Sequence, residues 1–527
     1  MITPPLSPTD QDNFKPYSST SRLILVSNRL PVTIDRSDDD RIQYHRSSGG
    51  LVTCMSGLRP NQASRWYGWP GSVEPHQNCE IRKDLMRDHG AVPVFLEEDL
   101  ASKHYNGFSS MFEATLQAIA IDNIKIDSVL WPALHYQDSM INFNNCDWEA
   151  YQKVNRKFAV EIAFNAVNGD NVWVHDYHLM LLPQILREEA EKRGMQLVIG
   201  FFLHTPFPSG DMFRVLPVWR ELLEGVLHCD LIGFHAPSYN ANFKRACSDL
   251  LKLTESPMGV SFRDRLVRTG DFPIGLDPKK ILDCLQKPEV KTRIAALTEQ
   301  NPGMIYIIGV DRLDYIKGIP QKLDALDLFF EEHPEMVRKV MMIQVAVPSR
   351  EGVLEYRTLA ARIHQRVDEI NAKYGTPNYQ PIKLLHRSVS FEDLVVLYAS
   401  SDVCLITSIR DGMNLVSYEY IACQKDRHGV LMLSEFAGAS ERLAGSLLFN
   451  PWDKAATANA IYRALTMDLG ERAANHRKEE EFVMNNTRYG SRKMNYPTTL
   501  YELTCNDSSA RWTEKFVAEL SRLGLGS

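Results

Sequence analysis

The segment Arg410–Glu419 has the residue types and spacing of an anion-binding turn that leads into a helix. It follows the apolar run Val403–Ile406 and contains a glycine, so we expect the chain to leave a strand, turn and begin a helix there. The free amides and the dipole at a helix N-terminus favour a bound diphosphate. Glu419 lies seven residues beyond Gly412, about two helical turns, so both face the same side. Its carboxylate could therefore accept hydrogen bonds from the two hydroxyls of a ribose.

A second charged string, Asp311–Gly318, follows the apolar run Met304–Val310 and carries Arg312 and Lys317. A ligand with phosphate groups brings negative charges, which a water-poor site could not hold unpaired. Arginine pairs with phosphate through two parallel hydrogen bonds, and lysine acts as a point charge. Gly49–Gly50 would let the backbone approach a diphosphate or a sugar closely. Two further cations follow other predicted strands: Arg29 and Arg350.

Polar residues also follow the predicted strands in the first half of the chain. These residues are His175 and Asp176 after Val172–Val174, His204 after Leu197–Leu203, and His235 after Leu231–Phe234. The carboxyl ends of the strands are where ligands bind in an open parallel sheet. Any one such residue could be a buried group that caps a helix. The whole set at strand ends favours a ligand site.

Short apolar runs alternate with longer amphipathic segments from about Arg22 to Leu465. The continuous runs are typical of strands buried on both faces of a parallel sheet, and the segments between them predict helices. The predicted fold is α/β, with two Rossmann-like doubly wound domains facing each other across a cleft. The predicted strands are 23–26, 172–174, 197–203, 231–234, 304–310, 340–347, 382–385, 403–406 and 430–433. The clearest predicted helices are 151–164, 179–192 and 320–332.

A bend rich in Pro and Gly, Phe272–Pro278, separates the two series of strands and predicts a domain boundary. Residues 1–20 are rich in Pro, Ser, Thr and Asp, which predicts a disordered tail. We expect one domain over 21–275, with an insertion at 111–127, and a second over 276–480. The remaining segment, 481–527, is expected to contain a second insertion and a final helix.

Composition and missing motifs exclude several classes of function. The chain has 527 residues and a formal net charge of −7, which argues against a general binder of nucleic acid or anionic membranes. No apolar run reaches the roughly 18 residues that span a membrane, and the tail lacks a secretory signal, so we expect the cytoplasm. No Gly-x-Gly-x-x-Gly follows the first strand and no P-loop string occurs. His175 and His178 lack the rest of a ligand set, so no metal is expected.

In sum, these strings resemble the trehalose-6-phosphate synthases, retaining glycosyltransferases of the GT-B fold that use UDP-glucose and glucose 6-phosphate. The likeness runs from about Arg22 to Leu465 and is nearest to the single-domain fungal type. It implies that the last helix crosses back to the first domain and that UDP-glucose is a co-substrate, with no other cofactor. It also allows a homo-oligomer or a complex with trehalose-phosphate phosphatase and regulatory subunits. The matching strings are 26–31, 173–178, 201–208, 309–318, 346–350 and 411–419.

The resemblance implies roles for particular residues. The implied catalytic residues are Asp176, His204, Arg312, Lys317 and Asp411. The implied acceptor-binding residues, in the first domain and at Arg350, are Arg29, Tyr105, Trp131, Asp176 and Arg350. The implied donor-binding residues are Gly50, Arg312, Lys317, Val389, Asp411, Gly412, Met413, Asn414, Leu415, Val416, Ser417, Tyr418 and Glu419. His204 is expected near the hydroxymethyl group of the transferred glucose, and Val389 near the uracil ring.

Two extra segments depart from the family pattern: 111–127, between the strings of Tyr105 and Trp131, and roughly 483–502. Tyr105 and Trp131 are therefore the site residues most open to displacement. The departures leave two alternatives to the synthase: a catalytically weak or inactive paralogue that acts as a regulatory subunit, and a transferase with a different sugar-phosphate acceptor.

Overall fold

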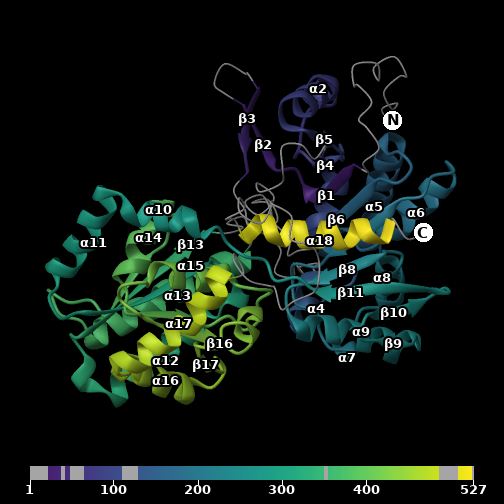
Figure 1. Ribbon diagram of the computed structural model, residues 1–527. Coiled ribbons are helices and arrows are strands. Elements are labelled where there is room, and N and C mark those ends of the chain that lie inside the picture. Colours follow the sequence, from purple (N-terminus) through teal and green to yellow (C-terminus); the bar gives the residue numbers. More distant parts are fainter. Residues whose placement is uncertain are drawn as a thin grey trace, which may run out of the picture. The chain divides into compact units, whose positions relative to one another are not determined.

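The computed structural model describes residues 22–36, 42–47, 64–109, 129–348, 354–485 and 508–524 (Figure 1). The predicted tail, 1–20, and the predicted insertion at 111–127 lie outside these residues. Contacts between Cα atoms divide the chain into two units. Unit 1 holds the described residues up to Phe272 together with those from Thr513 onward, and unit 2 is Pro273–Trp512.

Unit 1 is built on a nine-stranded sheet whose order is β5-β4-β1-β6-β7-β8-β11-β10-β9. Neighbouring strands from β5 to β11 run parallel, and β10 pairs antiparallel with both β11 and β9. The antiparallel edge was not predicted. The strands are β1 Leu23–Arg29, β4 Ser64–Trp69, β5 Ala91–Pro93, β6 Asn171–His175, β7 Val198–Phe202, β8 Leu231–Phe234, β9 Glu255–Ser256, β10 Gly259–Phe262 and β11 Arg265–Asp271, beside a separate hairpin of β2 Val32–Arg36 and β3 Ile42–Arg46.

Two helices of unit 1 were predicted, and each has a counterpart: α5 begins six residues before the predicted 151–164, and α6 lies within the predicted 179–192. Asn144 caps the first turn of α5 by accepting a hydrogen bond from the Cys146 amide, and this helix contains the predicted segment 151–164. The helices are α2 Asn78–His89, α3 Glu98–Ser102, α4 Leu130–Leu134, α5 Asn145–Asn165, α6 Leu182–Glu191, α7 Gly210–Phe213, α8 Trp219–Leu227, α9 Pro237–Leu251 and α18 Ser508–Gly524.

Unit 2 has a six-stranded sheet of order β14-β13-β12-β15-β16-β17, and all of its pairs are parallel. The strands are β12 Ile305–Arg312, β13 Val340–Val347, β14 Ile382–Leu385, β15 Val403–Ile406, β16 Val430–Ser434 and β17 Leu447–Phe449. The helices are α10 Pro278–Gln286, α11 Pro288–Gln300, α12 Ile319–Glu332, α13 Leu354–Tyr374, α14 Phe391–Ser400, α15 Leu415–Cys423, α16 Lys454–Thr466 and α17 Leu469–Asn485. The predicted doubly wound α/β architecture is confirmed in each unit.

The C-terminal helix α18 packs against the sheet of unit 1, to which its residues from Thr513 onward belong (Figure 1). Its Phe516 side chain is fully buried and stacks on Trp173 of β6, with ring centroids 4.4 Å apart. Gly200 and Gly233 make room for this ring: a Cβ atom at either position would lie 2.8 or 2.7 Å from it. The helix is therefore part of the core of unit 1.

The structure describes the first residues of the second predicted insertion, roughly 483–502. Val483, its expected first residue, lies inside α17 and is only 3% exposed. Helix α17 packs on α15, where Phe482 lies beside Tyr418 and the buried His476 ring approaches the Ile421 carbonyl at 3.2 Å. Residues 486–507 lie outside the described residues. Within the described ranges, no helix is long and apolar enough to cross a membrane.

We predict that Phe516→Ala lowers the stability of the protein by about 3 kcal/mol, because a fully buried aromatic ring is replaced by a cavity. Thermal unfolding followed by circular dichroism would measure the change. Arg522→Ala is the matched control, since this side chain on the same helix is 61% exposed. A Phe516→Ala transition at the control temperature would contradict the packing described for α18.

Candidate active site

In unit 2, a short ion pair joins two of the predicted site residues. Lys317 ends a 3₁₀ turn after β12, and Asp411 follows β15, the strand paired with β12. The Lys317 Nζ atom lies 2.6 Å from Asp411 Oδ2, and each side chain is 12% exposed. The structure therefore brings these two predicted site residues together.

Asp411 is held in its ionised form by its neighbours. Burial disfavours its charge, but Lys317 and hydrogen bonds from Ser408 Oγ (3.1 Å) and Asn414 Nδ2 (2.9 Å) outweigh this. The pKa of Asp411 is therefore lowered from its ordinary value. One carboxylate thus orders a cation, a hydroxyl and an amide around it.

Asn414 connects this carboxylate to the helix that follows. It has a positive φ of 71°, which asparagine tolerates better than most residues, and its Oδ1 accepts a hydrogen bond from the Ser417 amide at 3.2 Å. A helix leaves the other amides of its first turn, here those of Leu415 and Val416, without intrahelical acceptors. The start of α15 therefore offers backbone donors close to Lys317.

Several side chains of the predicted donor string point into the protein. Ser417 and Tyr418 are buried; the Ser417 hydroxyl donates to the Asn414 carbonyl, and the Tyr418 hydroxyl contacts the Met413 sulfur at 3.8 Å. These two residues could serve a ligand only through their backbones. Glu419 accepts a hydrogen bond from Tyr398 at 3.1 Å, and burial raises the pKa of Glu419 above its usual value.

Arg312 and Val389 lie at other strand ends of unit 2. Arg312 is the last residue of β12; its side chain is exposed and has no ion-pair partner among the described residues. Val389 is half-buried in the segment between β14 and α14. Gly50 and Arg350, the other predicted contacts, lie outside the described residues.

A fully buried polar cluster beneath this site was not predicted. Lys322 of α12 lies 2.7 Å from Asp311 Oδ2, and Gln344 of β13 bonds to both side chains. Gly309 is required beside it, because a Cβ atom there would lie 2.6 Å from the Lys322 Nζ atom. In the sequence, nothing distinguishes Lys322 from an exposed helical lysine. Its burial follows from the ion pair with the buried Asp311, which only the structure shows.

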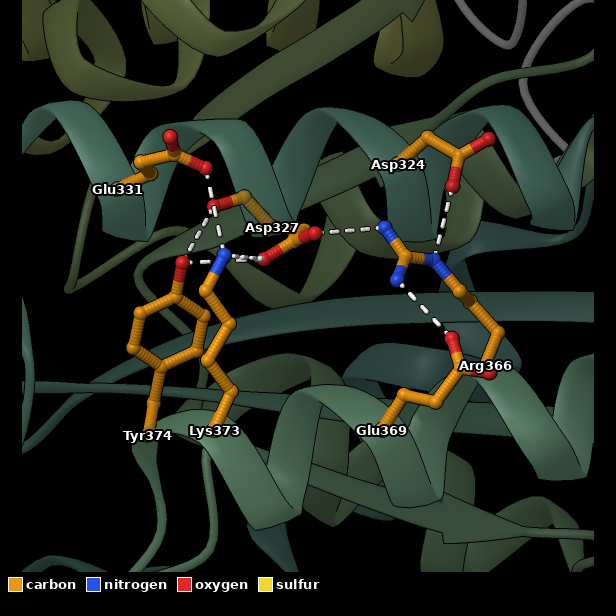
Figure 2. Close-up of polar contacts among 7 residues, drawn as sticks. All are labelled: Asp324, Asp327, Glu331, Arg366, Glu369, Lys373 and Tyr374. Carbon is orange, nitrogen blue, oxygen red and sulfur yellow. Dashed lines mark hydrogen bonds and ion pairs between the residues drawn. The ribbon is translucent and has the colours of Figure 1, made fainter.

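Helices α12 and α13, which follow β12 and β13, are tied together by a charged network (Figure 2). Arg366 of α13 contacts Asp324 and Asp327 of α12 at 2.9 and 2.7 Å. Lys373 contacts Asp327 and Glu331 at 3.0 and 3.2 Å. Because α12 begins directly after the turn of Lys317, this network steadies the helix that supports that turn.

In unit 1, Arg29 lies against aromatic rings at the end of β1. Its guanidinium carbon is 4.5 Å from the centroid of Trp69, its partner residue on β4, and 5.8 Å from that of Tyr105. Tyr105 lies in a π-helical turn, Lys103–Ser109, and stacks on His178 with centroids 5.5 Å apart. The structure therefore brings two of the predicted acceptor residues, Arg29 and Tyr105, together.

Trp131 and Asp176 complete the predicted acceptor residues that the structure describes. Trp131 is 7% exposed in α4, with its ring 5.9 Å from that of Tyr177. Asp176 follows β6 with φ 74° and ψ 167°, a conformation that non-glycine residues rarely adopt. Burial raises the pKa of Asp176 to about 7, although the amides of Tyr177 and His204 oppose the shift.

Three histidines lie side by side at the ends of adjacent strands in unit 1. His175 ends β6, His204 lies just beyond β7 and His235 directly follows β8. The His175 Nδ1 atom is 3.1 Å from His204 Nε2, and the His204 Nδ1 atom is 3.2 Å from His235 Nε2. Burial lowers the pKa of His175 to about 3 and that of His204 well below its usual value.

Comparison with known proteins shows one consistent family. The sequence profile of glycosyltransferase family 20 matches residues 21–496. The chain is 48% identical to alpha,alpha-trehalose-phosphate synthase [UDP-forming] 1 of Aspergillus niger over 508 residues, which are 96% of this chain and 91% of that protein.

Two solved structures resemble the chain over nearly their whole length. One is described as trehalose-6-phosphate from E. coli bound with UDP-2-fluoro glucose; it is 30% identical, with a TM-score of 0.77, and covers 95% of this chain and 99% of its own. The other is an alpha,alpha-trehalose-phosphate synthase (UDP-forming) from Burkholderia xenovorans in complex with glucose-6-phosphate. It is 28% identical, with a TM-score of 0.75, and covers 95% of this chain and 100% of its own.

We predict that Lys317→Met lowers stability by about 3 kcal/mol at pH 7.5, because it leaves Asp411 charged and buried without its cation. The lowered pKa of Asp411 in the folded protein means that its ionised form stabilises the fold above the ordinary carboxyl pKa of about 4. The cost of the substitution should therefore shrink as the pH falls toward 4, where Asp411 of the variant can be protonated. Urea unfolding at pH 7.5 and 4.5 measures both values.

The double variant Lys317→Met/Asp411→Asn should recover part of the loss at pH 7.5, since no buried charge is left alone. An equal cost for the single variant at both pH values would show that Lys317 does not compensate the Asp411 charge.

Proposed function

The chain belongs to glycosyltransferase family 20, and we propose that it transfers glucose from UDP-glucose to glucose 6-phosphate, giving α,α-trehalose 6-phosphate and UDP with retention at the anomeric carbon. The observation that carries the proposal is the pair of Lys317 and Asp411 at the start of α15. Lys317 supplies a cation, and the start of α15 supplies backbone amides without intrahelical acceptors; both suit a diphosphate. A relative of this chain is named for this reaction.

For the donor, we assign the diphosphate to Lys317, Arg312 and the amides of Leu415 and Val416. Negative charge develops on the leaving UDP as the glycosidic bond breaks, and cations already in place stabilise it without reorganisation. Glu419 is assigned to the ribose hydroxyls and Val389 to the uracil ring. Asp411, Gly412, Met413 and Asn414 are assigned to the transferred glucose, with His204 at its hydroxymethyl group and Gly50 near the diphosphate.

For the acceptor, we assign the phosphate of glucose 6-phosphate to cations, Arg29 and Arg350. Arg29 is exposed beside Trp69 and Tyr105, so its charge can reach a phosphate without first breaking an ion pair in the described residues. Tyr105, Trp131 and Asp176 are assigned to the sugar ring. The solved relative in complex with glucose-6-phosphate supports this choice of acceptor.

We propose that the glucosyl group is transferred without a covalent enzyme intermediate. The acceptor hydroxyl attacks the anomeric carbon on the face that UDP leaves, and its proton passes to the departing phosphate. The carboxylates assigned to the two glucose rings, Asp176 and Asp411, then orient hydroxyl groups. Lys317, Ser408 and Asn414 all contact the Oδ2 atom of Asp411 and so fix the direction of this carboxylate.

The proposed partners are the two substrates, with UDP-glucose as co-substrate and no further cofactor. A homo-oligomer, or a complex with a trehalose-phosphate phosphatase and regulatory subunits, and a cytoplasmic location belong to the same proposal by family resemblance. Among the residues that the structure describes, no group of three or more His, Cys, Asp and Glu side chains could hold a metal ion.

The proposal is tested by measuring UDP release from UDP-glucose with and without glucose 6-phosphate, with the product identified by mass spectrometry. We expect release that depends on glucose 6-phosphate and a disaccharide phosphate product. Binding of UDP-glucose without turnover would overturn the proposal in favour of a regulatory paralogue. Turnover only with another sugar phosphate would overturn the acceptor assignment.

We predict that Arg312→Ala weakens UDP binding by more than about tenfold, because a charge-assisted contact to the diphosphate is lost. Its thermal transition should not move, since Arg312 is exposed and has no ion-pair partner among the described residues. Isothermal titration calorimetry with UDP measures the affinity. Arg463→Ala on α16, 64% exposed, is the matched control and should bind UDP as the wild type does. Unchanged affinity in Arg312→Ala would remove Arg312 from the diphosphate site.

A further inference from the structure

His175, His204 and His235 form a row of rings whose nitrogen atoms lie at hydrogen-bond distance. His175 is 0% exposed and His235 3% exposed, and both flank the half-buried His204 with nitrogen atoms at hydrogen-bond distance. Strands β6, β7 and β8 are direct neighbours in the sheet, and this adjacency makes the row possible. Each ring comes from a different strand end, so the row joins three neighbouring strand ends.

Counting protons shows that the row behaves as one unit. A neutral imidazole has one N–H donor and one bare nitrogen acceptor. Two bonds between three neutral rings can form together only if all protons point the same way, with His204 donating one bond and accepting the other. Both neighbours therefore determine the position of the His204 ring, and loss of either leaves one of its nitrogens without that partner.

The backbone of His204 holds Asp176. The His204 amide donates to Asp176 Oδ1 at 3.2 Å, and the Asp176 amide donates to the Phe202 carbonyl at 2.7 Å. Asp176 also directly follows His175, the first ring of the row. A non-glycine residue with φ 74° and ψ 167° is strained and keeps this conformation only when its surroundings impose it. The amides of His204 and Tyr177 hold the Asp176 carboxylate. The amide of Asp176 itself is bonded to Phe202, and the histidine row includes its neighbour His175.

We propose that His175 and His235 are positioning residues: by holding His204 between them, they keep the strained Asp176 carboxylate in the orientation that binds the acceptor sugar. This inference rests on the proposed function, in which Asp176 binds the acceptor. It assigns to His175 and His235 a role that acts through His204 and Asp176, with no substrate contact of their own.

The test compares two kinds of substitution at each position. His175→Phe and His235→Phe keep a ring but remove the hydrogen bond, whereas His175→Asn and His235→Gln can restore a polar atom near the lost nitrogen. We expect the Phe variants to raise the KM for glucose 6-phosphate about tenfold while their affinity for UDP, measured by calorimetry, stays at the wild-type value. The Asn and Gln variants should stay within about twofold of the wild-type KM.

His228→Phe is the matched control, since His228 is also a buried histidine of unit 1 but precedes β8, at the opposite end of that strand from His235. It should leave the KM unchanged. A wild-type KM in both Phe variants would overturn the inference. So would Gln and Asn variants as impaired as the Phe variants, because ring packing and not hydrogen bonding would then matter.

A second measurement decides the matter if the Phe variants do not fold. In protein labelled with ¹⁵N-histidine, His204 should appear as a neutral ring at pH 7, and its signals should shift in His235→Gln; a charged His204 would overturn the inference. A wild-type enzyme that turns over glucose 6-phosphate, together with unaffected Phe variants, defeats only this inference. A wild type without such turnover defeats the proposed function itself.

Discussion

The proposed nucleotide site depends on one interaction, the ion pair between Lys317 and Asp411. A buried carboxylate is costly unless it is paired and hydrogen-bonded, and Asp411 has a lysine, a serine hydroxyl and an asparagine amide around one oxygen atom. Asn414, one of these partners, also caps α15. The same contacts that offset the burial of Asp411 therefore fix the turn, start the helix and hold the cation beside its amides.

In unit 1, the carboxylate at a strand end, Asp176 after β6, is held by different interactions. Asp176 has no cation partner among the residues that the structure describes. Burial raises its pKa to about 7, and backbone amides with the neighbouring histidine row hold its strained backbone. A carboxyl group with a pKa of about 7 is present in both its protonated and its ionised form at neutral pH. It can therefore donate a hydrogen bond to a sugar hydroxyl or accept one from it, which suits an uncharged part of the acceptor. The Arg29 guanidinium, exposed against aromatic rings, leaves a full positive charge for a phosphate.

The elements were predictable because continuous apolar runs have few alternatives to a buried parallel strand: β8, β13, β14 and β15 match the predicted ranges residue for residue. The short strands β4, β5 and β17 were missed, as was the antiparallel edge formed by β9 and β10. The sequence predicted that polar residues at the strand ends form a ligand site, but it did not predict which of them contact each other. The Asp311–Lys322–Gln344 cluster and the inward direction of Ser417 and Tyr418 depend on three-dimensional packing, which spacing along the chain does not encode.

A crystal structure of the protein with UDP bound would show whether the diphosphate lies at the start of α15. We expect phosphate oxygens within hydrogen-bond distance of the Lys317 Nζ atom and of the amides of Leu415 and Val416, with the contact between Lys317 and Asp411 retained. A diphosphate bound away from the start of α15 would contradict the claim that Asp411 organises the nucleotide site, and so would a bound state in which Lys317 and Asp411 separate.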